Sequence, residues 1–186
     1  MNPIVEGYPG HIIIDGKPHK IRTGFRYWIQ ISRLFDDESL SDWAKLSTLY
    51  ELADLEPTES PLSDVKALGV FLCHGEEPKG TGGARTFDFD FDSGRIIASF
   101  QQQYGLDLTD PELKLHWWHF LDLFSGLGDG TPIINAINVR EMELPAGNDA
   151  DTRKRRQQIN EAKRRLRIPP KNAAERLARD REIWGD

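Results

Sequence analysis

The sequence contains one cysteine and no long apolar run. A single cysteine, Cys73, cannot form an internal disulfide, and its apolar surroundings in VFLCH favour a buried structural thiol over a nucleophile. No segment approaches the roughly 20 apolar residues that span a bilayer, and the first residues, MNPIVEGYPGH, lack the basic and apolar regions of a signal peptide. We therefore expect a protein that makes no membrane contact and stays in the cytoplasm.

Signatures of common catalytic sites are missing as well. The chain has no nucleophile elbow for Ser-His-Asp or Cys-His catalysis. The glycine-rich residues 80 to 83 (GTGG) lack the lysine and the Ser/Thr of a P-loop, and they lie in a longer segment from Gly75 to Arg85 that contains four glycines. We interpret this segment as a flexible connection, and we expect no catalytic residues and no cofactor.

The composition fits one soluble domain with a charged tail. A chain of 186 residues with 38% hydrophobic and 29% charged residues can bury one core, and two full domains are not expected. The charge is divided unevenly, because residues 151–186 contain 12 Lys and Arg against 6 Asp and Glu, whereas residues 1–150 contain 12 against 24. An arm of net charge +6 on a body of −12 points to charged partners or to self-association.

Hydrophobic periodicity predicts a mainly α fold with a small N-terminal β-hairpin. Asp15-Gly16 is the expected turn between strands at 11–14 and 19–21. Alternating Phe and Asp at 87–92 (FDFDFD) predict a half-buried strand. Helices are expected from Thr23, from Ser39 or Ser41 to Leu55, from Ser63 to His74, from Asp92 or Ser93 to Gly105, from Asp110 to Ser125, from Thr131 to about Glu143, from Thr152 to Arg167, and from Asn172 onwards.

The helix expected from Asp110 to Ser125 is apolar on nearly every side, so we predict that it lies at the centre of the core. We expect one compact helical domain over residues 1–145. The composition of the segment PAGNDAD, from Pro145 to Asp151, predicts a linker to a basic helical C-terminal arm over residues 146–186.

Two groups of residues suggest a metal site. Asp88, Asp90 and Asp92 begin like a calcium-binding loop, but the glycine stands one place late and the twelfth position is Ser99 instead of Glu. We favour a solvated strand face. His116 and His119 have the i, i+3 spacing that aligns two imidazoles on a helix, yet two ligands are too few. We therefore favour hydrogen-bonded histidines at the boundary of the core and predict no metal.

The C-terminal arm holds a cluster of basic residues in RKRRQQINEAKRRLR. Such a cluster contacts phosphates, but this one contains no aromatic residue for base stacking and is attached to an acidic domain. We favour a protein-binding helix over binding to nucleic acid. The residues predicted to contact a partner are Arg153, Arg155, Arg156, Arg164 and Arg165.

The order FDFDFD, IIASFQQQYGLDL, LHWWHFLDLFSGL and TPIINAINVRE resembles the gene-product-fifteen family of the tail module of long-tailed bacteriophages. The resemblance is specific from Phe71 to Glu141. It implies a non-enzymatic tail assembly protein that acts in the host cytoplasm as a chaperone for the tape measure protein. The tail tube protein and further copies of the chain are additional expected partners, and the family supplies no catalytic motif.

Three hypotheses of function follow. The first is the chaperone, which we expect to cover apolar helices of its client in a groove. The second is a nucleic-acid-binding adaptor that uses the basic arm. The third is a metal-dependent hydrolase that uses Asp88, Asp90 and Asp92 with His116 or His119.

Overall fold

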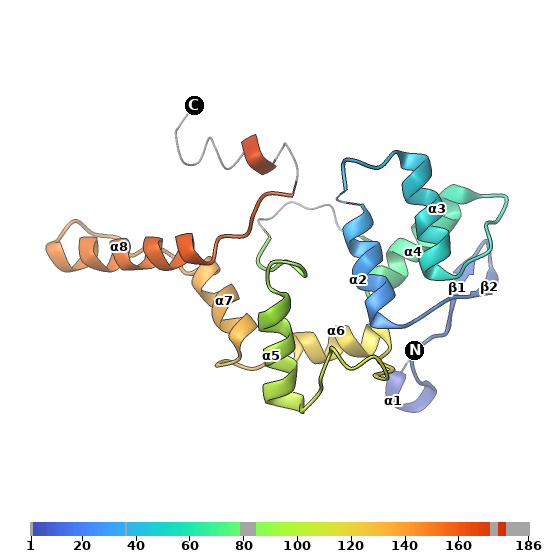
Figure 1. Cartoon of the computed structure of the whole chain (residues 1–186), viewed down its shortest axis with the longest axis horizontal. Coiled ribbons are helices and arrows are strands. Elements are labelled where there is room, and N and C mark those ends of the chain that lie inside the picture. The colour runs from blue at the N-terminus through green and yellow to red at the C-terminus, as the bar shows by residue number, and fades with distance from the viewer. Residues whose placement is uncertain (1, 36, 79–84, 172–174, 178–186) are drawn as a thin grey trace. The chain divides into compact units, whose positions relative to one another are not determined.

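The computed structural model describes residues 2–35, 37–78, 85–171 and 175–177, and in these ranges the protein is mainly α-helical with one small antiparallel hairpin near the N-terminus (Figure 1). The predicted fold class is therefore confirmed. The loop residues 80–83 and most of the helix expected from Asn172 lie outside the described residues, although Glu175 to Leu177 are helical. None of the helices in the described part of the chain combines the length and apolarity needed to cross a bilayer.

The elements have the following bounds in chain order: α1 (Pro3–Glu6), β1 (His11–Ile14), β2 (Lys17–Lys20), α2 (Phe25–Leu34), α3 (Asp42–Ala53), α4 (Pro61–Leu72), α5 (Ser93–Tyr104), α6 (Trp117–Ser125), α7 (Pro132–Glu141) and α8 (Ala150–Arg165).

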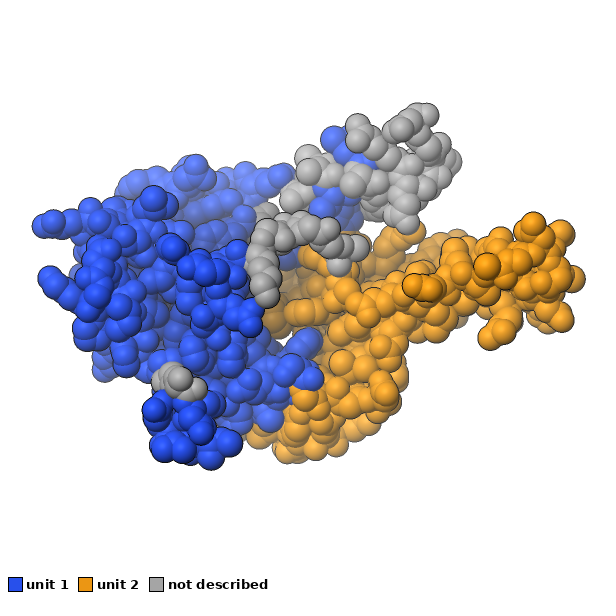
Figure 2. All heavy atoms as spheres, turned by 180° about the vertical axis from the view of Figure 1, so that it is seen from behind, with its two compact units in different colours: residues 1–81, 114–125, 170–186 blue, residues 82–113, 126–169 orange. Residues whose placement is uncertain are grey.

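The chain forms two compact units (Figure 2). Unit 1 comprises residues 1–81, 114–125 and 170–186, and unit 2 comprises residues 82–113 and 126–169. The predicted division into a domain over 1–145 and an arm over 146–186 stays a prediction that truncation can test.

The hairpin of unit 1 forms with its turn at Asp15-Gly16 as predicted, but its second strand spans Lys17–Lys20 instead of the predicted 19–21. Asp15 and Gly16 have φ angles of 47° and 78°, which match the left-handed pair that a tight two-residue hairpin requires. The register pairs Ile14 with Lys17 and Ile12 with His19. Ile12 and Ile14 are buried, whereas Ile13 between them is 55% exposed, so one face of β1 packs on the core of unit 1.

Aromatic side chains from α2, α4 and α6 fill the core of unit 1. Trp28 and Phe120 are fully buried. The ring of Phe120 stacks on Phe25 with 5.3 Å between centroids and on Trp117 with 5.6 Å, and Trp28 packs on Phe71 at 4.5 Å. The indole N–H of Trp28 donates to the carbonyl of Arg22 at 2.7 Å, so its polar atom is satisfied inside the core.

Unit 1 also buries the carboxylate of Asp64 on α4. It accepts hydrogen bonds from the hydroxyl of Tyr50 at 2.7 Å and from the hydroxyl and backbone N–H of Thr58 at 2.6 and 3.0 Å. Burial alone raises the pKa of Asp64, but these hydrogen bonds from Thr58 and Tyr50 lower it below its usual value. The carboxylate therefore fixes the turn between α3 and α4.

The predicted start of the central helix at Asp110 is wrong, because α6 begins only at Trp117. Asp110 instead opens a single turn, in which its carbonyl accepts from the N–H of Leu113. The backbone then pairs with the segment before α2: Phe25 N–H donates to the carbonyl of Leu115 at 3.0 Å, and Trp117 N–H donates to that of Thr23 at 2.7 Å. These long-range bonds replace the first turns of a helix.

The predicted strand FDFDFD is also wrong. Residues 89–92 form turns that lead into α5. The side chain of Asp88 accepts the N–H groups of Asp90 and Phe91, both at 2.9 Å, and the N–H of Asp92 donates to the carbonyl of Asp88 at 2.9 Å. Aspartate side chains compete with extended structure in this way, and here the local bonds decide the backbone.

Most other helix limits lie close to the predicted ones. Ser41 caps α3 by accepting from the N–H of Ala44, and Gly105 ends α5 at φ 68°. The helix α4 begins at Pro61, two residues before the predicted Ser63. The helix α8 begins inside the predicted linker, because Asp149 caps it through the N–H of Thr152 at 2.8 Å.

Candidate functional site

The three aspartates proposed for a metal site differ in environment, and they are not a solvated strand face. Asp92 is fully buried, and its carboxylate accepts a hydrogen bond from each terminal nitrogen of the Arg140 guanidinium, both at 2.8 Å. Arg95 donates to the same carboxylate at 3.0 Å. Asp88 is paired with Arg85 at 2.6 Å, and Asp90 is exposed.

Arg140 ties three segments of unit 2 together, and sequence reasoning missed it. Besides Asp92, its guanidinium donates to the carbonyl of Thr86 at 2.8 Å and to that of Leu166 at 2.7 Å. Arg85 donates in turn to the carbonyl of Pro169 at 2.8 Å. The FDFDFD turn therefore anchors α7 and the end of α8, and its buried carboxylate serves as an arginine partner.

The two histidines of unit 1 differ in environment, because His116 is half-buried at the boundary of the core and His119 is exposed. His116 lies just before α6, where its Nδ1 accepts the N–H of Trp118 at 3.0 Å, so Nε2 carries the proton and donates to the carbonyl of Pro9 at 3.1 Å. Burial lowers the pKa of His116. The ring of Tyr8 stacks on His116 at 5.0 Å and on His119 at 5.6 Å. His116 therefore matches the predicted hydrogen-bonded histidine, whereas His119 is exposed, so the interpretation holds for His116 alone.

A second set of polar contacts holds the N-terminal segment against α6. The hydroxyl of Tyr8 donates to Asp122 at 2.7 Å, and burial, followed by this bond, raises the pKa of Tyr8 to about 12. His74 Nε2 lies 3.0 Å from the other oxygen of Asp122, and its ring stacks on Trp118. Across the residues that the structure describes, no three His, Cys, Asp or Glu side chains form a group able to hold a metal ion.

Cys73 ends α4 and is half-buried, so the expectation of a buried thiol is met only in part. Burial raises the pKa of its thiol, with Glu76 adding to the effect. A raised pKa reduces the thiolate fraction, which is the reactive form. The environment of Cys73 therefore suits a structural residue.

The basic residues predicted to contact a partner all lie on α8, but they are not equivalent. Arg153, Arg155, Arg164 and Arg165 are exposed, and Arg165 pairs with Glu161 along the helix at 2.6 Å. Arg156 is half-buried and donates to the carbonyls of the linker residues Pro145 and Gly147 at 3.0 and 2.9 Å. Arg156 thus folds the linker against α8 and is not part of a free basic surface.

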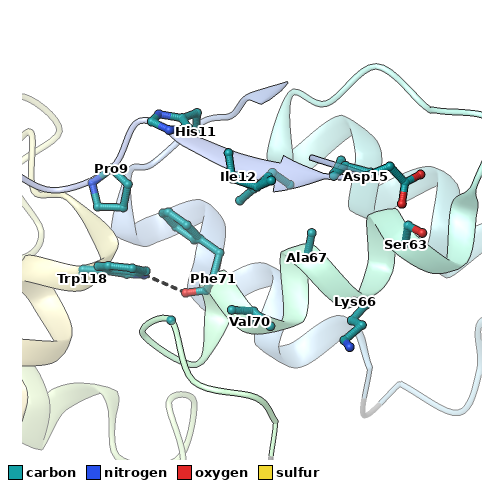
Figure 3. A pocket seen from close by; sticks show the side chains of 13 residues that line it. Pro9, His11, Ile12, Asp15, Ser63, Lys66, Ala67, Val70, Phe71 and Trp118 are labelled. Atoms are coloured by element: carbon teal, nitrogen blue, oxygen red, sulfur yellow. Dashed lines mark hydrogen bonds between the residues drawn. The ribbon is translucent and has the colours of Figure 1, made fainter. Parts of the chain in front are cut away.

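Unit 1 also contains a groove, which sequence reasoning missed. Its volume is about 620 Å³, within the range of ligand-binding pockets. Figure 3 shows it between β1 and α4, with Ala67 pointing from α4 toward the strand. The lining residues are Pro9, His11, Ile12, Ile13, Ile14, Asp15, Ser63, Lys66, Ala67, Val70, Phe71, Gly75 and Trp118.

Two aromatic side chains in the lining of this groove contact each other. The indole N–H of Trp118 donates to the carbonyl of Phe71 at 2.8 Å, and their rings lie 5.3 Å apart (Figure 3). The α4 residues of the lining repeat at three and four positions, so they form one helix face. That spacing is visible in the sequence. The pairing of this face with β1 is not, because more than 45 residues separate them.

Comparison with known proteins gives one match. The family model described as Bacteriophage Gp15 protein matches residues 7–166, a range that includes both the groove and α8. No curated protein and no solved structure matches the chain.

Proposed function

The chain belongs to the bacteriophage Gp15 family, and we propose that it is a tail assembly protein, a chaperone that binds the tape measure protein in the host cytoplasm during tail morphogenesis. The observation that supports this proposal is the family match over most of the chain. The resemblance of the segments between Phe71 and Glu141 to the tail module of long-tailed phages adds the specific role.

The groove between β1 and α4 is where we propose that the client binds. Ile, Val, Ala and aromatic side chains form much of its lining. A tape measure protein that has not yet been enclosed by tube subunits exposes apolar segments, and an apolar groove can cover such segments. Covering them would keep the client soluble until tube subunits replace the chaperone.

Co-expression tests the proposal directly. The tape measure protein from the same phage genome should be soluble with this chain and aggregated without it, and the two should co-purify. An Ala67→Arg variant, which places a charge in the groove, should lose most of this effect. The matched control is Ala98→Arg at an exposed position of α5, which should retain it. Unchanged solubility together with no complex would remove the support for a chaperone.

We further propose that the protein is not an enzyme and needs no metal. The melting temperature of the purified protein should therefore be the same with and without a chelator, and elemental analysis should find no stoichiometric metal. A fall of several degrees on chelation would contradict this and direct attention to His116 and His119.

The exposed arginines of α8 are proposed to bind acidic surfaces of a tail partner or of another copy. Changing Arg153, Arg155, Arg164 and Arg165 to Gln should leave the fold intact and weaken association, and association of the unchanged protein should weaken as salt is raised. Arg156 is kept because it holds the linker. Tight, salt-dependent binding of random duplex DNA, lost in this variant, would instead favour the nucleic-acid adaptor.

A parallel truncation tests the predicted domain limit. Removal of residues 152–186 is expected to leave residues 1–145 folded, as judged by circular dichroism. The truncation also removes the carbonyls of Leu166 and Pro169 that Arg140 and Arg85 bind, so the melting temperature should fall by a few degrees without loss of the fold. An unfolded product would place the end of α8 in the core of unit 2.

A further inference from the structure

We infer that the groove between β1 and α4 binds its partner as an extended segment that adds a strand to the outer edge of β1. This inference rests on the proposed function, since it specifies the conformation of the client at the same site. We thus propose an extended client segment in place of the apolar client helix that the sequence led us to expect. The two-stranded sheet of the described residues ends at β1, so this edge is not covered by a third strand.

The register of the hairpin shows which backbone groups face outward. Ile14 and Lys17 flank the two-residue turn and therefore form a hydrogen-bonded pair, and the N–H of Ile21 donates to the carbonyl of Gly10 at 3.2 Å. Pairs alternate along an antiparallel ladder, so Ile13 opposite Pro18 is a non-hydrogen-bonded pair. The N–H and C=O groups of Ile13, and by the same alternation of His11, point away from β2.

Pro18 agrees with this assignment, because a proline in a strand is tolerated where its missing N–H would face outward. The edge of β1 consequently offers two donors and two acceptors at the spacing that an added strand uses.

The dimensions of the groove suit a short extended segment. His11 to Asp15 extend over about 13 Å at 3.3 Å per residue. The facing residues of α4, from Ser63 to Phe71, cover about 12 Å at 1.5 Å per residue. The β1 wall and the α4 wall of the groove therefore each match the length of four or five residues of an extended strand. Alternate side chains of an added strand would point onto α4, against Ala67 and Val70.

Charge indicates what the segment carries and argues against a second copy. Lys66 lines the groove, and its ion pair with Glu77, at 3.3 Å, is largely exposed and thus easily exchanged. The hairpin adds Lys17 and Lys20 against the single acid Asp15. A second copy joined through β1 would present the same hairpin, with two lysines and one acid, and so would offer no excess of acidic residues to Lys66. The complementary partner is an extended segment with apolar residues at alternate positions and an acidic residue near Lys66.

The test uses the full-length chain and a random peptide library displayed on phage, selected on the unchanged protein after depletion on Ala67→Arg. Enriched peptides are expected to alternate apolar and polar residues and to contain acidic ones. On binding of an enriched peptide, the amides of His11 and Ile13 should become protected from hydrogen exchange. Apolar residues at helical spacing in the enriched peptides, exchange unchanged at both amides, or no enrichment would each overturn the inference.

Two variants at one position separate backbone from side chain. Ile13→Pro removes an outward N–H but keeps the ladder to β2, and should weaken binding of the enriched peptide at least about tenfold, from the lost hydrogen bond and its geometry. Ile13→Ala keeps the N–H and should weaken binding less. Equal effects would contradict strand addition, and the hydrogen-exchange result decides the matter if Ile13→Pro fails to fold.

The same experiment distinguishes this inference from the proposed function. Overlapping peptides of the tape measure protein are assayed beside the library peptides. If library peptides bind by strand addition and no tape measure peptide does, the groove is assigned correctly and its client is another protein. If the Ile13→Pro and Ala67→Arg variants each keep the tape measure protein as soluble as the unchanged chain does, the chaperone function is supported. The assignment of client binding to the groove then fails.

Discussion

Replacing Asp92 with alanine is expected to lower the free energy of unfolding of unit 2 by about 3 to 5 kcal/mol. This is the typical cost of removing one partner from a buried ion pair, because the other charge is left unpaired. The guanidinium of Arg140, whose side chain is 9% exposed, would lose two hydrogen bonds of 2.8 Å. Urea denaturation followed by circular dichroism measures the loss.

Two companion variants test the reason for this effect. Asp90→Ala changes an exposed carboxylate in the same turn and should cost less than about 1 kcal/mol. The double variant Asp92→Leu with Arg140→Met leaves no unpaired charge at this pair and should recover part of the stability that Asp92→Ala loses. Recovery is partial because the carbonyls of Thr86 and Leu166 still lose their donor. A loss below about 1 kcal/mol for Asp92→Ala would show that the ion pair does not hold unit 2 together.

Phe120→Ala is expected to destabilise unit 1 by about 3 to 5 kcal/mol, the range found when a buried aromatic side chain is removed. Phe120 is fully buried and lies between the rings of Phe25 and Trp117. Loss of its ring leaves a cavity that two rigid neighbours cannot fill. Tryptophan fluorescence during urea unfolding reports the change, because Trp28 and Trp117 belong to the same core.

The control for this prediction is Phe35→Ala. Phe35 follows α2 and is 46% exposed, so its removal should change stability by less than about 1 kcal/mol. Similar losses at Phe35 and Phe120 would mean that α6 does not organise the core of unit 1.

Local chemistry made much of the fold predictable. The limits of α3 and α5 follow from Ser41 as an N-cap and Gly105 as a left-handed C-cap, and the hairpin follows from Asp15-Gly16. Each of these signals acts within a few residues. A helix end or a tight turn needs no distant partner, so a single sequence contains the information.

The errors arose where distant partners decide the backbone. The turn at FDFDFD is joined to Arg140, 48 residues away, and a buried carboxylate in a turn has the same sequence pattern as one on a solvated strand. The start of α6 is set by Thr23 and Gly24, which pair with the residues around His116. Local periodicity cannot distinguish a backbone bonded to its own turn from one bonded to a remote segment.

By itself, the sequence determined that the protein is mainly helical, that its acidic and basic residues are separated along the chain, and that it resembles the phage family whose model it matches. Only the tertiary structure decided that Arg156 is bound to the linker, that Asp92 is paired with arginine, and that β1 and α4 enclose a groove. The physical reason is that caps, turns and charge depend on neighbours in sequence, whereas a groove or a buried ion pair exists only after segments far apart in the chain have packed together.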